Sequence, residues 1–369
     1  MGENMKCIYT GENLDSKTTA EHILQAFTGA KWKSKYIASN SIQRFFSTAY
    51  DNSMAECFAF IRNLLNIAGD HKSAGPKGSD LQDSKGHKYR LRHGQYKLID
   101  PIVSDPIDID ENIKNVTITM GDRRDYGLAE HLVRQKIPNG YKIVGHSELK
   151  SMSVTSAETG MLKTRITFLG VPCMKAILKS SFNLLGANDA QVAHLRCFDA
   201  LRSVLVDVNN MDIHKFCEVP KQTEYLPLPK SSIADHILTV YTNRDRVLGF
   251  ARLYGQFCFS MLLTSAYNGP DFRYAYFVNP YAHSDNRDCN INFDILPEFE
   301  GINDASLTFD ATQRAFERLL NDYYDQELHK SIQSIVDAVF AKYKDEPVIT
   351  EAMMNEVLQN LFLRLEMYE

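Results

Sequence analysis

The first fifty or so residues hold the pattern that most constrains the fold of this 369-residue chain. A carboxylic acid and an imidazole are adjacent at Glu21-His22. An apolar pair follows, and Gly29 comes seven positions after His22. Short apolar pieces at 6–9 and 35–38 have the length of strands, being too short for helices. We expect these two pieces to pair as strands.

A helical pattern follows directly. Its apolar residues recur three or four positions apart: Met54, Cys57, Phe58, Ile61, Leu64 and Leu65. Such spacing is typical of a helix that buries one face. Gly69 lies just past the last of them, where helices commonly stop. Strands followed by a helix predict a ββα unit over residues 1–70.

Five short segments follow one another in this stretch: Cys7-Ile-Tyr-Thr-Gly11, Glu21-His-Ile-Leu-Gln25, Gly29-Ala30, Ser39 to Gln43, and Asp51. In order and spacing they resemble the start of the bacterial HNH (ββα-metal) endonucleases. That family has a Cys-x-x-Cys-Gly knuckle, a Glu-His-Ile-Ile-Pro segment, a Leu-Gly-Gly turn, a Cys-x-x-Cys-Asn knuckle and an aspartate. The resemblance implies a nuclease fold in the N-terminal domain.

The residues that would hold the family's structural zinc are mostly replaced. Cys7 remains, but Thr10, Ser39 and Ile42 stand where the other three thiolates would be. Zinc in structural sites needs thiolate or imidazole ligands, so we expect no structural zinc. We expect apolar packing to hold the unit together instead, through Ile8, Tyr9, Ile42, Phe45 and Phe46.

The resemblance also assigns catalytic roles by position. His22 would be the general base and Glu21 a ligand of a catalytic Mg²⁺ (or Mn²⁺), since carboxylate oxygens suit hard cations. Gln43 stands at the family's second ligand position. If the segment is aligned one knuckle earlier, Asn40 takes that place. The spacing from Gln43 to Asp51 favours Gln43.

The charge of the whole chain does not favour nucleic acid. Lys plus Arg number 41 against 46 for Asp plus Glu, a formal net charge of −5, so phosphate contacts must come from a local patch. One candidate is a predicted hairpin with a turn at His93-Gly94. Its exposed cations are Lys88, Arg90, Arg92 and Lys97. They would follow a DNA backbone, or they are simply the charged face that protects an edge strand from aggregation.

Beyond a linker with this hairpin (71–112), residues 113–369 form a larger mixed α+β domain ending in helices. We expect strands at 116–120 and 141–144 and helices at 126–136, 172–186 and 190–206. An antiparallel meander over 236–263 follows, with further helices from 315 to 340 and from 353 to 365. The overall fold class is therefore α+β.

Several classes of protein are disfavoured. No apolar run reaches the roughly 18 residues of a membrane span, and no signal peptide is found at the N-terminus. The seven cysteines are scattered without a Cys-x-x-Cys pair, which favours free thiols in a reducing cytoplasm. Phosphate-binding loops, nucleophile elbows and zinc-protease helices are also missing from the sequence.

The sequence thus predicts a metal-dependent DNA endonuclease that hydrolyses phosphodiester bonds, in bacterial restriction or phage defence. The alternative is a catalytically inactive nucleic-acid-binding or regulatory protein on a degenerate HNH fold. An apolar stripe in the C-terminal helices, including Ala315, Leu319 and Val339, further suggests a homodimer, which would set two active sites against two DNA strands.

Overall fold

The computed structural model describes residues 5–69, 78–108, 114–121, 123–137, 168–221, 226–282, 290–301, 304–344 and 348–365. The chain is a mixed α+β protein and divides into two compact units. Unit 1 comprises Met1–Gly75 with Thr167–Leu328, and unit 2 comprises Pro76–Ile166 with His329–Glu369. The domain boundaries expected from sequence, at 70 and 112, differ from this grouping.

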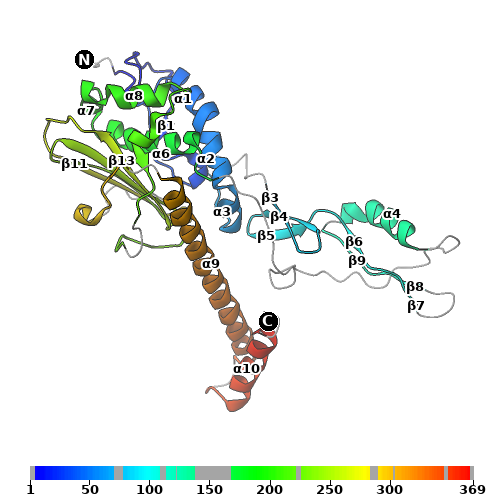
Figure 1. The fold of residues 1–369 in the computed structure, drawn as a ribbon. Helices are drawn as coiled ribbons and strands as arrows, with labels where there is room; N and C mark the ends of the chain where they lie inside the picture. Colours follow the sequence, from blue (N-terminus) through cyan, green and yellow to red (C-terminus); the bar gives the residue numbers. More distant parts are fainter. Residues whose placement is uncertain are drawn as a thin grey trace. The chain divides into compact units, whose positions relative to one another are not determined.

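A five-stranded antiparallel sheet forms one layer of unit 1 (Figure 1). Its strand order is β10-β13-β12-β11-β14. The strands are β10 (Cys217–Glu218), β11 (His236–Asn243), β12 (Arg246–Leu253), β13 (Phe257–Thr264) and β14 (Arg273–Val278). The predicted meander is confirmed as β11 to β13. Nearly every residue of these three strands is buried, because both faces of the sheet are covered.

Helix α6 (Val171–Asn188) covers one face of this sheet and is the most buried helix of the unit. Pro172 stands in its first turn, where a proline costs no hydrogen bond. The helix contacts β10, β11, β12 and β14 on one side and the N-terminal helices on the other. Two lysines are buried along it, Lys175 and Lys179. The predicted helix from Pro172 is confirmed.

The N-terminal part of unit 1 has the order strand, strand, helix. Strand β1 (Glu21–His22) pairs antiparallel with β2 (Lys33–Ser34), and α1 (Asn40–Phe46) follows. The strand positions that we expected at 6–9 and 35–38 are wrong: these segments share a single backbone bond, from Ile8 N–H to Ile37 O at 2.9 Å. Their apolar residues are buried in the core without forming a ladder.

The helical pattern of the N-terminal part is confirmed. After α1 come a π-helical segment (Ser47–Asp51), α2 (Asn52–Cys57) and α3 (Ala59–Leu64). All six apolar residues that defined the pattern are buried. The residues expected to replace the zinc also pack together: Ile8, Tyr9, Ile42 and Phe46 share one core, and the ring centroids of Tyr9 and Phe46 are 4.7 Å apart.

The helix predicted over 190–206 is broken into pieces. Helix α7 (Ala190–Ala193) is capped by the Asp189 carboxylate, a 3-10 turn covers Arg196–Phe198, and α8 (Asp199–Val206) follows. Helix α9 (Ala305–Lys342) contributes Ala315 and Leu319 to the core of unit 1. This part of the apolar stripe therefore packs within its own unit.

Unit 2 contains a three-stranded antiparallel sheet in the order β3-β4-β5. Its strands are β3 (Ser79–Gln82), β4 (Lys88–Arg92) and β5 (Gln95–Leu98). The strand β3 lies where we expected a linker. Because β4 is the middle strand, the explanation of its cations as edge protection is wrong. The hairpin turn is confirmed, with His93 and Gly94 both at positive φ.

The rest of unit 2 is made of short pairs and helices. Strand β6 (Ile102–Val103) pairs with β9 (Ile118–Thr119), and β7 (Ile107–Asp108) with β8 (Lys114–Asn115). The predicted helix α4 (Tyr126–Lys136) is confirmed, and α10 (Glu351–Leu365) follows α9. The strand expected at 141–144 lies outside the described residues. In the described part of the chain, no helix has the length and apolar character needed to cross a bilayer.

Candidate functional site

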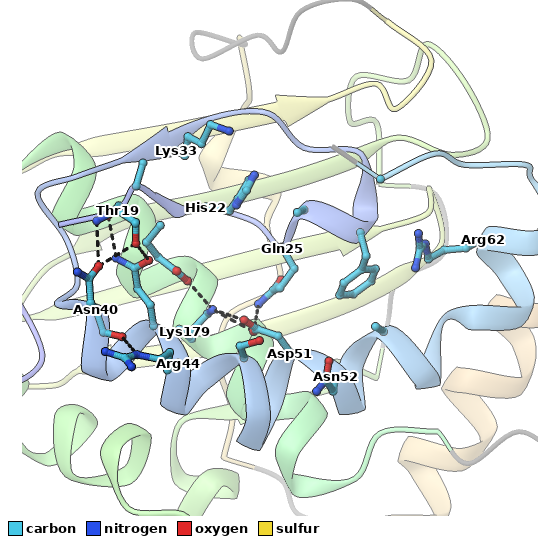
Figure 2. Close-up of a pocket in the computed structure, with 18 residues that line it drawn as sticks. Thr19, His22, Gln25, Lys33, Asn40, Arg44, Asp51, Asn52, Arg62 and Lys179 are labelled. Carbon is cyan, nitrogen blue, oxygen red and sulfur yellow. Dashed lines mark hydrogen bonds and ion pairs between the residues drawn. The ribbon is translucent and has the colours of Figure 1, made fainter. Parts of the chain in front are cut away.

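Unit 1 contains a cavity of about 790 Å³ beside the β1–β2 hairpin (Figure 2). All four residues that the resemblance selected in the N-terminal part line it: Glu21, His22, Asn40 and Gln43. They come from β1 and α1, two elements that the ββα order places next to one another. The cavity therefore brings together every predicted catalytic and metal-binding position.

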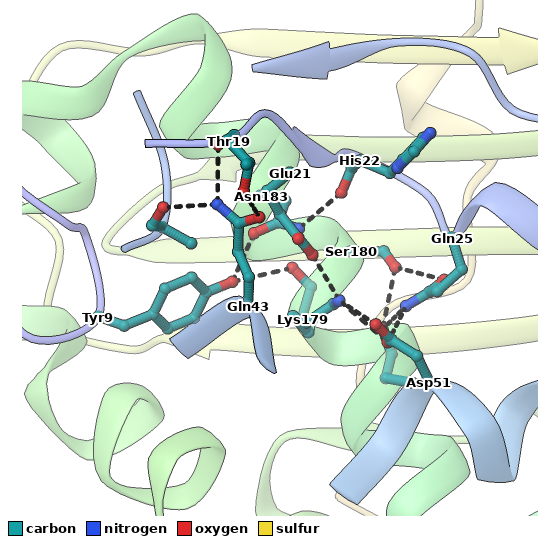
Figure 3. Close-up of polar contacts among 12 residues, drawn as sticks. Tyr9, Thr19, Glu21, His22, Gln25, Gln43, Asp51, Lys179, Ser180 and Asn183 are labelled. Atoms are coloured by element: carbon teal, nitrogen blue, oxygen red, sulfur yellow. Dashed lines mark hydrogen bonds and ion pairs between the residues drawn. The ribbon is translucent and has the colours of Figure 1, made fainter. Parts of the chain in front are cut away.

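A buried lysine joins two carboxylates at the floor of the cavity (Figure 3). The ammonium nitrogen of Lys179, on α6, lies 2.7 Å from Oε1 of Glu21 and 2.9 Å from Oδ1 of Asp51. The lysine side chain is 1% exposed, and those of Glu21 and Asp51 are 12% and 23% exposed. The three side chains form an ion-paired triad with a net charge of −1.

The triad fixes the protonation state of the lysine. Burial alone would lower the pKa of Lys179, but the charges of Asp51 and Glu21 outweigh it and hold the pKa above its ordinary value. An ammonium that is shielded from water and held by two carboxylates gains strong electrostatic stabilisation. Lys179 therefore remains a fixed positive charge beneath the cavity.

Gln25 ties the triad to α6. Its amide nitrogen donates to Asp51 Oδ1 at 3.2 Å and to the Ala176 carbonyl at 2.9 Å, and its oxygen accepts from the Ser180 hydroxyl at 3.1 Å. The family's proline at this position cannot donate or accept in this way. The glutamine thus has a defined structural role in orienting Asp51.

The two predicted amide ligands turn toward Thr19. The Thr19 hydroxyl donates to Oε1 of Gln43 at 2.7 Å and lies 2.8 Å from Oδ1 of Asn40, which also accepts from the Thr19 N–H at 2.9 Å. The Gln43 amide nitrogen donates to the carbonyls of Thr19 and Ala38. Both side chains therefore fasten the segment before β1 to α1.

His22 and Glu21 project from opposite faces of β1, as neighbouring strand residues do. In Figure 3 the imidazole of His22 points away from Lys179 and Asp51. Lys33 is the cross-strand partner of His22 in β2, so these two side chains share one face of the hairpin. The backbone carbonyl of His22 accepts from the Asn183 amide at 2.9 Å, which anchors β1 to α6.

The implied Mg²⁺ can be tested against this arrangement. Two carboxylates suit a hard cation, but the ammonium of Lys179 already lies between them, and both amide oxygens accept from Thr19. Nowhere among the described residues do three or more His, Cys, Asp or Glu side chains gather as a metal site would require. As arranged, these residues do not fit a divalent cation.

The cavity is nevertheless electropositive. Its lining includes four cationic side chains, Lys33, Arg44, Arg62 and Lys179, against the two carboxylates of Glu21 and Asp51. This excess of two positive charges stands out in a chain of net charge −5. A concave surface that concentrates one sign of charge attracts ligands of the other sign. The arrangement is therefore suited to an anion.

The basic strand of unit 2 has the alternation expected from the sequence. Lys88, Arg90 and Arg92 are exposed on β4, whereas Tyr89 and Leu91 are buried. Arg90 is engaged by the Asp80 carboxylate through two bonds of 2.7 and 3.1 Å, and this pairing lowers the pKa of Asp80. Lys97 lies opposite Arg90 on β5.

Several residues of the site escaped the sequence reasoning. Some lie near the motif or on the helices that follow it: Thr19, Lys33, Arg44 and Arg62. Three more, Lys179, Ser180 and Asn183, lie on α6, more than 150 positions from β1, and only the structure brings them to the site. The single signal in the sequence was polar and charged residues within an otherwise apolar helix.

Comparison with known proteins finds no matching family model, no matching curated protein and no matching solved structure.

Proposed function

We propose that unit 1 binds nucleic acid through its phosphodiester backbone and hydrolyses it as an HNH-like endonuclease. The observation that carries the proposal is that Glu21, His22, Asn40 and Gln43, selected from the resemblance, line one electropositive cavity behind a strand-strand-helix unit. Phosphodiester hydrolysis needs a base for the attacking water and positive charge near the phosphate.

The β1–β2 hairpin carries both a base and a positive charge on one face. His22 supplies an imidazole able to take a proton from water, and Lys33, directly across the hairpin, supplies a cation for a phosphate oxygen. Residues that face one another across an antiparallel pair have Cβ atoms about 5 Å apart. On the opposite face, the Glu21–Lys179–Asp51 triad holds β1 against α6. The triad therefore positions the hairpin that carries the base.

The Mg²⁺ dependence that the resemblance implies stays a prediction. The lysine between the carboxylates favours a second candidate function, a nucleic-acid-binding protein that does not cleave. A role in restriction or phage defence is part of the proposal only through the resemblance.

The homodimer also stays a prediction, and the apolar stripe now gives it little support. Ala315 and Leu319 are buried in the core of unit 1, and Val339 is buried too. Light scattering decides the question. One mass equal to a single chain, with and without DNA, would remove the dimer.

Cleavage of supercoiled plasmid and linear DNA tests the main proposal. Wild type, His22→Ala and, as a matched control outside the cavity, His214→Ala are compared with Mg²⁺, with Mn²⁺ and with EDTA. We expect wild type and His214→Ala to cut and His22→Ala to be at least a hundredfold slower. Equal cutting by His22→Ala would refute the assignment of the base. Binding without cutting by wild type would favour the second candidate.

A further inference from the structure

Arg62 is a buried arginine for which the described part of the chain offers no counter-ion. It lies on α3, is 5% exposed, and lines the cavity at the end away from Asn40 (Figure 2). Among the residues that the structure describes, its buried Nε atom has no hydrogen-bond partner, and no carboxylate pairs with its guanidinium. Fully buried charges are rare in proteins unless they are paired.

The surroundings of Arg62 hold the side chain but do not neutralise it. Its guanidinium carbon lies 5.1 Å from the centroid of the Phe27 ring, a cation–π contact. Gly69, another lining residue, packs closely beside it: a Cβ built there would lie 3.2 Å from the Ala26 carbonyl oxygen and 3.6 Å from an Arg62 terminal nitrogen. Burial lowers the pKa of Arg62. The Phe27 ring offsets part of the cost of burying the charge, but no carboxylate among the described residues neutralises it.

The position of Arg62 allows a ligand longer than one nucleotide. Eleven positions of mostly helical chain separate it from Asp51 in the triad, and at about 1.5 Å per residue they span at most about 16 Å. One strand of DNA advances about 3.4 Å per nucleotide. The cavity therefore has room for more than one nucleotide between Arg62 and the triad.

We propose that Arg62 forms a second phosphate subsite, separate from the hairpin, so that the cavity binds a nucleic-acid strand and not a mononucleotide. This inference rests on the proposed function, because it assumes that the anion is a nucleic-acid phosphate. Arginine suits this role because its planar guanidinium donates two parallel hydrogen bonds to phosphate oxygens.

The test compares Arg62→Met, Arg62→Lys and a matched control, Arg196→Met, an exposed arginine of unit 1 outside the cavity. Fluorescence anisotropy measures the affinity of each full-length protein, in a His22→Ala background, for a labelled twelve-residue oligothymidylate. The dinucleotide pTpT serves as a competing ligand. Thermal unfolding of each variant is measured without DNA.

We expect Arg62→Met to raise the dissociation constant for the oligonucleotide at least tenfold. The inhibition constant of pTpT should change less than twofold. Arg62→Lys should retain part of the affinity, and Arg196→Met nearly all of it. Since an unpaired buried charge is removed, the melting temperature of Arg62→Met should equal or exceed that of wild type. Unchanged oligonucleotide affinity, or a melting temperature several degrees lower, would overturn the subsite.

Failure of this inference is distinguishable from failure of the proposed function. Oligonucleotide binding that depends on Arg62, without strand cleavage by wild type, would preserve the subsite and reject hydrolysis. Cleavage that depends on His22 but is indifferent to Arg62 would reject the subsite and preserve hydrolysis.

Discussion

The ammonium nitrogen of Lys179 lies 2.7 Å from Oε1 of Glu21, although 158 positions separate the two residues. The same nitrogen contacts Asp51, so one cation occupies the place between two carboxylates. The resemblance assigned Glu21 to a catalytic divalent ion. An ion bound there would have to compete with the lysine for the Glu21 carboxylate.

Removing the lysine should create a cation site. In Lys179→Met the two carboxylates lose their shared partner, and breaking a buried ion pair costs about 3–5 kcal/mol of unfolding free energy. Mn²⁺ should restore part of that stability, while leaving wild type almost unchanged at the same concentration. Calorimetric titration and thermal unfolding with Mn²⁺ measure both effects.

The double variant Lys179→Met with Asp51→Asn is the control, and it should not respond to Mn²⁺. If wild type binds Mn²⁺ as tightly as Lys179→Met, and Glu21→Gln abolishes that binding, then the lysine does not compete with the ion. The fit of Mg²⁺ to this site would then have to be reconsidered.

Lys33 should matter for cleavage and its neighbour Lys35 should not. Lys33 faces the same side of the hairpin as His22, whereas Lys35 is exposed outside the cavity lining. Loss of a cation that contacts the phosphate should lower kcat/KM about tenfold to a hundredfold. We expect this for Lys33→Gln on plasmid DNA and little change for Lys35→Gln. Equal effects of the two substitutions would show only a general loss of charge.

The sequence predicts those features of the fold whose residues lie close together along the chain. The helical pattern from Met54 to Leu65, the turn at His93-Gly94 and the meander are local signals, and all three were predicted correctly. The strands of the N-terminal unit were misplaced, because β1 and β2 are only two residues long each and have no alternating pattern. Two-residue strands leave no periodicity to detect.

The residues of the candidate site likewise fall into those that a local motif identifies and those that it misses. Glu21, His22, Asn40 and Gln43 lie within 23 positions of one another, so a motif can identify them. Lys179 comes from a helix far along the chain, and no local pattern connects it to Glu21. The orientation of the Gln43 amide toward Thr19 depends on hydrogen-bond geometry that residue spacing does not specify.

Buried His236, which contacts the loop between β1 and β2, should make the stability of the fold depend on pH. His236, buried on β11, has its Nε2 3.2 Å from the Thr28 carbonyl, and its Nδ1 accepts from the Tyr254 N–H at 3.1 Å. Burial lowers the pKa of His236 to about 4, against about 6.5 for an unperturbed histidine. Between these values the unfolded chain binds the proton more readily than the folded chain, so acid favours unfolding.

The contribution of His236 is therefore complete above pH 6.5 and is lost as the pH falls toward 4. The expected slope approaches 1.4 kcal/mol per pH unit, or about 3 kcal/mol in all. Denaturant unfolding of wild type and His236→Gln from pH 7.5 to 4 measures it. The variant should show a shallower slope over this window. A variant with the wild-type slope would assign the acid sensitivity to other groups.

The exposed cations of unit 2 can be tested separately. Arg90 is paired with Asp80, so Arg90→Ala should change DNA affinity less than Lys88→Ala or Arg92→Ala. Each lost phosphate contact should also reduce the slope of log affinity against log salt by about one. Anisotropy titrations at several salt concentrations give both quantities. If none of the three substitutions alters affinity or slope, β4 does not contact DNA.

If nucleic acid enters the cavity of unit 1 to be cut, then a bulky side chain placed in the cavity should slow cleavage. Ala55 lines the cavity on α2, whereas Ser53 on the same helix does not. Single-turnover cleavage of a labelled duplex is measured for Ala55→Trp and for Ser53→Trp, with both proteins shown to be folded. We predict that Ala55→Trp cuts at least tenfold more slowly than Ser53→Trp. Equal rates in the two variants would contradict the claim.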